Sequence, residues 1–226
     1  MNDAAVAERD AAPRKGSGGR PIREEAARRD ARIVAVATQL FMERGFDATS
    51  VDAVAETAGV SKPTLYARYR DKRALFEAVL RERIEAWLAP LSAAAEAQAQ
   101  EAGPEDAETV LGELSRTIAA RSNSPDAASL TRCIAAQAIQ FPDLARLAHE
   151  EGWLRGVRAV ARLLEILDAR GQIAVADPET AAELFLDLVR GGHTRLALYG
   201  LPADPDAQER RRRAAVRLFL DGVRPR

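Results

Sequence analysis

Basic and hydroxyl-bearing residues follow a short, glycine-led turn in the first third of the chain. Gly59-Val60-Ser61 separates two segments with helical apolar spacing, and Ser61 can cap the second of them. Two helices joined by a turn of about three residues that begins with glycine form a helix-turn-helix, here over residues 50–69. The second helix, residues 62–69, is then presented outward, where it fits a DNA major groove about 12 Å wide.

Five side chains in and after this second helix have the chemistry to contact DNA. Lys62 stands beside a helix N-terminus, where free N–H groups already favour a phosphate. Thr64 offers a hydroxyl and a methyl group to a base edge, and Tyr66 offers a hydroxyl on a rigid ring to a backbone phosphate. Arg68 can reach a phosphate or a guanine, and Lys72 can bind the opposite side of the groove.

Several residues of this region also have a purely structural interpretation. Capping alone would account for Ser61, and Lys62 and Lys72 can be solvated surface charges. Packing is the alternative for Tyr66, which we expect to face DNA, whereas we expect Tyr69 to lie in the core.

The composition excludes several classes of protein. The 226 residues include 33 Lys and Arg against 34 Asp and Glu, so the net charge of −1 gives no overall attraction to nucleic acid. Residues 14–73, however, hold 13 basic and 8 acidic residues, which indicates that this part meets an anion. A single cysteine, Cys133, and two histidines exclude a disulfide framework, a multi-cysteine zinc site and a histidine-rich metal centre. We therefore expect neither a metal nor a cofactor.

Enzymatic motifs are also missing from the sequence. It has no glycine-rich phosphate loop, nucleophile elbow, zinc-binding His/Glu helix motif or recognisable pair of catalytic carboxylates, so we expect a non-enzyme. The polar N-terminus lacks the apolar segment of a signal peptide, and no apolar run approaches the ~18 residues that cross a bilayer. We expect a cytoplasmic protein that does not enter a membrane.

The elements that must position these residues are all helical. In the first helix, apolar residues recur at i, i+4, i+7 and i+8. Glycine, proline and capping residues predict helices at about residues 26–44, 50–58, 62–69, 71–88, 105–121, 126–140, 143–170, 178–199 and 206–222. Gly152 can divide the segment 143–170 in two. The predicted fold class is all-α.

Motifs spread over residues 27–87 carry a family resemblance. They are Phe41-Met42-Glu43-Arg44-Gly45-Phe46-Asp47-Ala48-Thr49-Ser50-Val51, then Ala58-Gly59-Val60-Ser61-Lys62-Pro63-Thr64-Leu65-Tyr66, then Tyr69, Lys72 and Ala74-Leu75-Phe76. This stretch resembles the TetR/AcrR family of bacterial transcriptional regulators. The resemblance implies a homodimeric repressor with an N-terminal three-helix domain that binds operator DNA. A C-terminal helical domain would bind an inducer and form the dimer interface.

By position, the resemblance places the family's DNA contacts on eight residues: Thr49, Ser50, Ser61, Lys62, Thr64, Tyr66, Arg68 and Lys72. The family often has Phe or His-Phe around Arg68-Tyr69, so Arg68 departs from the pattern. The resemblance divides the chain into a flexible basic arm over residues 1–25, a DNA-binding domain over 26–88 and an effector-binding and dimerisation domain over 89–226.

The C-terminal half resembles a narrower group, the AefR-type effector domain. The residues that carry this likeness are Phe141-Pro142-Asp143-Leu144, Gly171, Asp177-Pro178, Phe185 and Gly191-Gly192.

Three basic residues of the N-terminal arm, Arg14, Lys15 and Arg20, lie next to its glycines or among them. Gly19-Arg20-Pro21 resembles the centre of an AT-hook, in which an extended arginine enters the narrow minor groove of A·T tracts. Two interpretations stay open, namely a minor-groove contact and a plain disordered linker.

The segment 181–199 is apolar on nearly all sides, so it must be covered on all sides. A second copy of the chain can cover one face in a two-fold four-helix bundle, and burial within one chain is the alternative. The predicted dimer interface comprises Leu184, Leu188, Gly192, Leu196, Leu218 and Phe219.

An inducer pocket is expected among the fourth to eighth helices, for an unidentified small apolar or amphipathic molecule. Its candidate walls are Trp87, Cys133, Gln137, Phe141, Trp153 and His193. Each of them can instead be an ordinary core residue. A lone cysteine such as Cys133 usually behaves as a small hydrophobe, with redox sensing as an alternative. The predicted partners are operator DNA, a second copy of the chain and this inducer, without a membrane.

Overall fold

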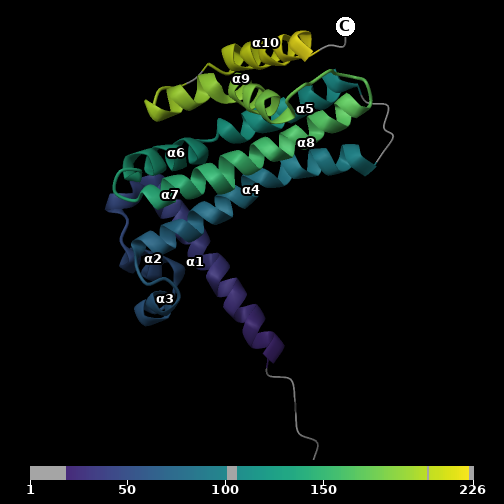
Figure 1. The fold of residues 1–226 in the computed structure, drawn as a ribbon. Helices are drawn as coiled ribbons and strands as arrows, with labels where there is room; N and C mark the ends of the chain where they lie inside the picture. Colours follow the sequence, from purple (N-terminus) through teal and green to yellow (C-terminus); the bar gives the residue numbers. More distant parts are fainter. Residues whose placement is uncertain (1–18, 101–105, 203, 224–226) are drawn as a thin grey trace, which may run out of the picture.

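The structure is a computed structural model of the 226-residue chain. It describes residues 19–100, 106–202 and 204–223, apart from the side chains of residues 19–22, 100, 193 and 197. Within these ranges the chain forms helices and connecting turns without a strand, which confirms the all-α prediction (Figure 1). The elements are α1 (Gly19–Ala48), α2 (Val51–Ala58), α3 (Lys62–Arg68), α4 (Lys72–Gln100), α5 (Ala107–Ser122), α6 (Pro125–Gln137), α7 (Pro142–Leu147), η1 (Ala148–Leu154), α8 (Arg155–Ala169), α9 (Pro178–Leu198) and α10 (Pro205–Val223).

The N-terminal helices α1, α2 and α3 pack around the start of α4. Their apolar faces meet in a core centred on three aromatic rings, in which Phe41 and Phe46 each pack edge-to-face on Phe76 with centroids 5.0 and 5.3 Å apart. Edge-to-face pairs of this kind add to the stabilisation that the buried area provides. This core fixes the base on which α2 and α3 rest.

The first helix begins at Gly19, earlier than the predicted start at Ala26. Part of the segment that was predicted to be a flexible arm therefore continues the helix. At the other end, Gly45 has φ +81° and interrupts the helical backbone, as expected for the residue that follows the last apolar position.

The fourth helix continues through Pro90 to Gln100, beyond its predicted end near residue 88. A proline inside a helix leaves the carbonyl four residues earlier without its N–H donor. Here Arg121 of α5 replaces the missing donor, because its Nη1 donates to the Ala86 carbonyl oxygen at 2.6 Å. As a result, one uninterrupted helix runs from the N-terminal core into the C-terminal one.

The C-terminal helices form a second, larger core. α4 and α8 lie side by side, α9 packs on α8, and α10 lies above α9, with α5 beside α9 and against α10 (Figure 1). Phe185 of α9 and Phe219 of α10 pack edge-to-face at 5.1 Å inside this core. Between α7 and α8 the helix widens into the π-helical segment η1, which contains Gly152, so the predicted division at this glycine is a change of helix type rather than a break. Within the described residues, no helix is long and apolar enough to cross a membrane.

Candidate functional site

The turn between α2 and α3 has the geometry of a helix-turn-helix. Gly59 adopts a left-handed backbone, φ +64° and ψ +37°, which glycine accepts without a steric penalty. The N–H of Val60 donates to the Ala55 carbonyl at 3.0 Å, and this bond closes the end of α2. Ser61 then caps α3, because its Oγ accepts from the N–H of Thr64 at 3.3 Å.

The outer face of α3 carries three exposed side chains that were predicted to meet DNA. Lys62, Tyr66 and Arg68 point away from the core, with the Tyr66 residue 47% exposed. Leu65 and Tyr69 lie on the opposite side and are buried, as predicted for core residues. α3 is thus held by its apolar side, and its polar side is open to a partner. Contact of these three side chains with DNA stays a prediction.

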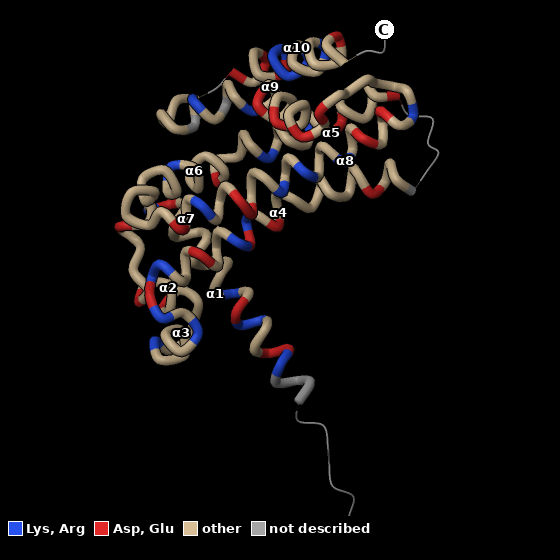
Figure 2. Tube along the Cα trace, in the orientation of Figure 1, with Lys and Arg blue, Asp and Glu red and all other residues tan. Residues whose placement is uncertain are grey.

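Two basic groups of this face are paired with carboxylates of neighbouring helices. Lys62 Nζ lies 2.5 Å from Asp52 Oδ2 of α2, and Arg68 Nε lies 2.8 Å from Asp30 Oδ2 of α1. These hydrogen bonds, together with the attraction between the charges, raise the pKa of both basic groups. A phosphate that approaches α3 therefore competes with Asp52 and Asp30 for these cations. Figure 2 shows basic positions around α3 and along the start of α1, where acidic ones alternate with them.

Lys72 lies at the start of α4, beside the loop that precedes α2. Its Nζ donates to the Asp47 carbonyl at 3.1 Å and lies 4.6 Å from the centroid of the Phe46 ring. This arrangement holds the ammonium group near the helix-turn-helix, on a different helix from Lys62.

The structure corrects the prediction for Thr49. This residue is 1% exposed, and its hydroxyl donates to carbonyl oxygens of Leu40 and Gly45 at 3.1 and 2.8 Å. Its side chain therefore fastens the loop to α1 and is not available to DNA. Ser50 is exposed and caps α2, because its Oγ accepts from the N–H of Ala53 at 3.1 Å, and Thr64 is half-buried with its Oγ1 2.7 Å from Ser61 Oγ.

The predicted minor-groove residues fall at the edge of the described chain. Arg20 belongs to the first turn of α1, whereas Arg14 and Lys15 lie outside the described residues. The two interpretations of the arm therefore both stand as predictions.

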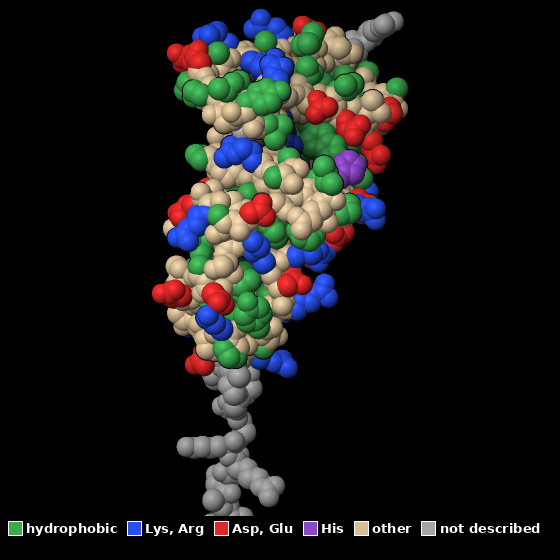
Figure 3. Space-filling view, turned by 90° about the vertical axis from the view of Figure 1, so that its left-hand side faces the viewer, with side chains coloured by type: hydrophobic (Ala, Val, Ile, Leu, Met, Phe, Trp, Pro, Cys, Tyr) green, Lys and Arg blue, Asp and Glu red, His purple; other side chains and the backbone are tan. Residues whose placement is uncertain are grey.

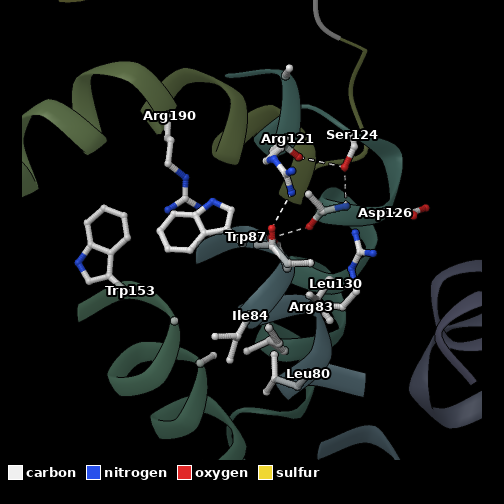
Figure 4. A pocket seen from close by; sticks show the side chains of 17 residues that line it. Leu80, Arg83, Ile84, Trp87, Arg121, Ser124, Asp126, Leu130, Trp153 and Arg190 are labelled. Atoms are coloured by element: carbon white, nitrogen blue, oxygen red, sulfur yellow. Dashed lines mark hydrogen bonds between the residues drawn. The ribbon is translucent and has the colours of Figure 1, made fainter. Parts of the chain in front are cut away.

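The C-terminal domain contains a cavity of about 600 Å³ between α4, α5, α6, η1 and α9. Both tryptophans that were predicted to line a pocket, Trp87 and Trp153, form part of its wall (Figure 4). Arg83, Arg121 and Arg190 line it as well, and none of them was predicted to do so. A cavity of this size is typical of small-molecule sites.

Three other predicted wall residues lie elsewhere. Cys133 and Gln137 occupy the opposite face of α6 and pack against the end of α1, where Cys133 Sγ lies 3.7 Å from the Phe41 carbonyl oxygen. Phe141 packs edge-to-face on Phe46 with centroids 5.6 Å apart. The prediction was wrong for Cys133 and Gln137 because α1, and not the cavity, covers that side of α6, and it was wrong for Phe141 because this residue follows α6 and packs on α1. The side chain of His193 lies outside the described residues.

Cys133 is a buried residue. It is only 7% exposed, and this burial raises the pKa of its thiol. The structure therefore favours the small hydrophobe over the redox sensor. Within the described residues, no group of histidine, cysteine and carboxylate side chains could hold a metal ion.

The predicted dimer residues separate into exposed and buried ones. Leu184 of α9 and Leu218 of α10 are 57% and 64% exposed, and three further exposed hydrophobic residues, Leu198, Tyr199 and Leu201, lie at the end of α9. Figure 3 shows hydrophobic side chains gathered on the upper part of one face, over α9 and α10.

The other four predicted dimer residues lie deeper within the chain. Leu188 and Leu196 are half-buried, and Gly192 lies against Arg211 of α10. Phe219 is buried in its own chain, stacked on Phe185, so its prediction as an interface residue was wrong.

Family models match both parts of the chain. Residues 33–79 match the model for bacterial regulatory proteins of the tetR family. Residues 109–222, half of the chain, match the model described as the AefR-like transcriptional repressor, C-terminal domain.

Relatives among curated proteins match the N-terminal part. The HTH-type transcriptional regulator RutR of Escherichia coli K12 is 41% identical over 75 residues, which is 33% of this chain and 35% of RutR. The HTH-type transcriptional activator FasR of Mycolicibacterium smegmatis is 37% identical over 68 residues, 30% of each chain. The chain thus spans about a third of the length of the curated relatives it matches.

Solved structures match over most of the chain. A TetR-family transcriptional regulator from Mesorhizobium loti has a TM-score of 0.82 at 27% identity, over 88% of this chain and 98% of that one. The flavonoid-responsive regulator FrrA is 33% identical, with a TM-score of 0.67 over 88% of this chain and 99% of its own. With an exposed recognition helix on a helix-turn-helix and matches over both of its parts, the chain belongs to the TetR family and is a DNA-binding transcriptional regulator rather than an enzyme.

Proposed function

We propose that the protein is a homodimeric repressor that leaves its operator when a small molecule occupies the cavity in its C-terminal domain. The observation that carries this proposal is the position of α6, which lines the cavity with one face and packs on α1 of the DNA-binding domain with the other.

The connection through α6 is made by side chains that belong to both cores. Leu130 and Ile134 line the cavity and also pack against the two hydrophobic clusters, the N-terminal one and the C-terminal one. On the far side of the same helix, Gln137 Nε2 donates to Asp47 Oδ2 at 3.3 Å. A ligand that displaces Leu130 or Ile134 therefore shifts the helix on which the DNA-binding domain rests.

The fourth helix provides a second connection. It begins beside the helix-turn-helix at Lys72 and lines the cavity with Leu80, Ile84 and Trp87. Packed helices of this kind move as rigid units, so a change at the cavity is passed to the recognition helix. A ligand that binds one arrangement of the heads better than the other then lowers operator affinity by a shift in population.

The exposed leucines on α9 and α10 support the dimer. Leu184 and Leu218 leave apolar surface in water that a second copy can cover in a two-fold interface. Two recognition helices related by such an axis read half-sites about one helical turn apart. The name of FrrA, a flavonoid-responsive regulator, supports a small-molecule effector for this chain as well.

Selection of duplexes from a randomised library with the purified full chain tests the DNA arrangement. We expect two half-sites with two-fold symmetry whose centres lie ~34–36 Å apart. A lone half-site would contradict the two-fold arrangement.

A reporter gene placed behind the selected site tests the sign of regulation. We expect cells that produce the protein to lower the reporter output, and we expect compounds from a small-molecule screen to restore it. A higher output in the presence of the protein would instead make it an activator.

A further inference from the structure

A cation points into the cavity between the only two tryptophans of the chain. Arg190 extends from α9 so that its guanidinium carbon lies 5.3 Å from the ring centroid of Trp87 and 5.2 Å from that of Trp153 (Figure 4). Guanidinium groups are attracted to the faces of indole rings at such distances. The two rings therefore hold the head of Arg190 in place from two sides.

The same cation lacks a full set of hydrogen bonds. Its Nε is buried and has no hydrogen-bond partner among the described residues. Burial lowers the pKa of Arg190, and the nearby Asp187 opposes this effect without a hydrogen bond to Nε. Leaving a buried donor of a charged group unpaired is costly, so a ligand oxygen that accepts from Nε gains the full benefit of that pairing.

The charges around the cavity favour an anion. Three arginines, Arg83, Arg121 and Arg190, line it together with one carboxylate, Asp126. A concave site with an excess of one charge concentrates the opposite charge. Nη1 of Arg121 is engaged by the Ala86 carbonyl, whereas Arg190 is the cation that lies between the tryptophans and has a buried, unpaired Nε.

Apolar side chains form much of the remaining wall. Leu80, Ile84, Leu130 and Ile134 line the cavity together with the two tryptophans, and Ser124 and Thr131 add hydroxyl groups. Trp87 lies directly on the backbone of α8, since a Cβ at Gly156 would overlap its six-membered ring. A fixed aromatic ring beside a cation suits a flat aromatic acid, whose ring can pack edge-to-face on the indole while its carboxylate meets the cation.

We propose that the effector is an aromatic carboxylate, with its carboxylate paired to Arg190 and its ring against the indoles of Trp87 and Trp153. Arginine binds a carboxylate through two parallel N–H donors, and Nε is one of the donors that such a pairing uses. This inference rests on the proposed effector-controlled function and specifies the chemistry that the site selects.

Calorimetric titration of the full chain, without DNA, tests the inference directly. The probes are naphthoate, its neutral amide naphthamide, and dodecanoate as an acid without a ring. We expect naphthoate to bind at least about tenfold more tightly than naphthamide, because a charge-assisted pair replaces a neutral one. Equal affinities of acid and amide, or binding of neither, would overturn the proposal. Tighter binding of dodecanoate than of naphthoate would overturn the inference that the effector is aromatic.

Variants locate the preference for the acid. Arg190→Met should bring naphthoate and naphthamide to equal affinity, whereas Arg190→Lys should keep part of the preference. Arg195→Met is the matched control, because Arg195 lines a neighbouring hollow with Arg190 and Trp153 but does not line the cavity. A preference that survives in Arg190→Met, or disappears in Arg195→Met, would contradict the assignment to Arg190.

Operator binding separates failure of this inference from failure of the proposed function. Fluorescence anisotropy of labelled operator reports whether naphthoate releases DNA from the wild type. Acid-selective binding without release of DNA would sustain the site and overturn the inducer role. If naphthoate and naphthamide release DNA equally at the same concentration, the inducer role is supported and the proposed recognition of a carboxylate is overturned.

Discussion

Arg121 Nη1 lies 2.6 Å from the Ala86 carbonyl oxygen, the acceptor that Pro90 leaves without a helical donor. Arg121→Met should lower the free energy of unfolding by about 1 kcal/mol, because the carbonyl then has no protein donor. Denaturant unfolding measures this change.

A double-mutant cycle with Pro90→Ala isolates the cause. Alanine restores the N–H at position 90, so the loss caused by Arg121→Met should shrink in the Pro90→Ala background. Equal losses in both backgrounds would show that Arg121 stabilises the fold in some other way.

Replacing the carboxylate beside Lys62 should strengthen DNA binding. Asp52→Asn removes the partner 2.5 Å from Lys62 Nζ together with a negative charge near the DNA. We expect operator and unrelated duplexes to bind about fivefold more tightly at low salt, with the gain fading as salt screens the charges. Asp126→Asn makes the same change in the first turn of another serine-capped helix and should leave affinity unchanged.

Arg68 and Lys62 should differ in what they contribute to recognition. Arg68→Ala should relax the preference at particular base pairs, at a cost of about 1–3 kcal/mol each. Lys62→Ala should instead weaken binding to all duplexes and reduce the slope of log affinity against log salt concentration by about one. Selection on a randomised operator library measures the base preference, and titration with salt measures the slope. Identical sequence logos for the wild type and Arg68→Ala would show that Arg68 does not read bases.

A charge on the exposed leucines should separate the dimer. Leu184→Glu and Leu218→Glu place a carboxylate in the proposed interface, and we expect monomers at concentrations where the wild type sediments as a dimer. Ile139→Glu is the control, since Ile139 is 97% exposed but follows α6 and lies outside the proposed interface. Dimers in both leucine variants would rule out this surface.

Acid should remove part of the stability of the α10 region. Hydrogen bonds from Arg212 and Arg213 lower the pKa of Glu209 to about 2 from an ordinary 4.5. A carboxyl whose pKa is lower in the folded chain stabilises it above pH 4.5, and this contribution disappears as the pH falls from about 4.5 to about 2. Glu209→Gln should therefore melt at a lower temperature than the wild type at neutral pH.

The difference in melting temperature between the two proteins should narrow through this acidic range. Thermal melts at several pH values, with Glu165→Gln on the exposed side of α8 as a control, measure it. A difference that stays constant down to about pH 2 would contradict the role of Glu209.

The sequence predicted those features that depend on local interactions. Apolar spacing and capping residues located the helices, and Gly59 and Ser61 marked the turn, because these signals act within a few residues. The passage of α4 through Pro90 could not be predicted in this way, since it depends on Arg121 in another helix. The start of α1 at Gly19 was also missed, because the glycines and prolines of that segment favour loops.

Side-chain positions in the site could be predicted where only one face of a helix packs on the protein. In α3, Leu65 is buried and Tyr66 is exposed, as predicted. The positions of Cys133 and Gln137 could not be predicted, because α6 is covered on both sides and the sequence does not show which side faces α1. Arg190 was not among the predicted wall residues, because the sequence does not show which side of α9 faces the cavity.

Both tryptophans of the chain line the same cavity. The tryptophan emission of the unlabelled protein therefore originates entirely at this wall. When it is excited at wavelengths that the three tyrosines do not absorb, its intensity and wavelength give an optical record of what enters the cavity. Occupancy can be followed in real time, in the native chain, without attaching a dye.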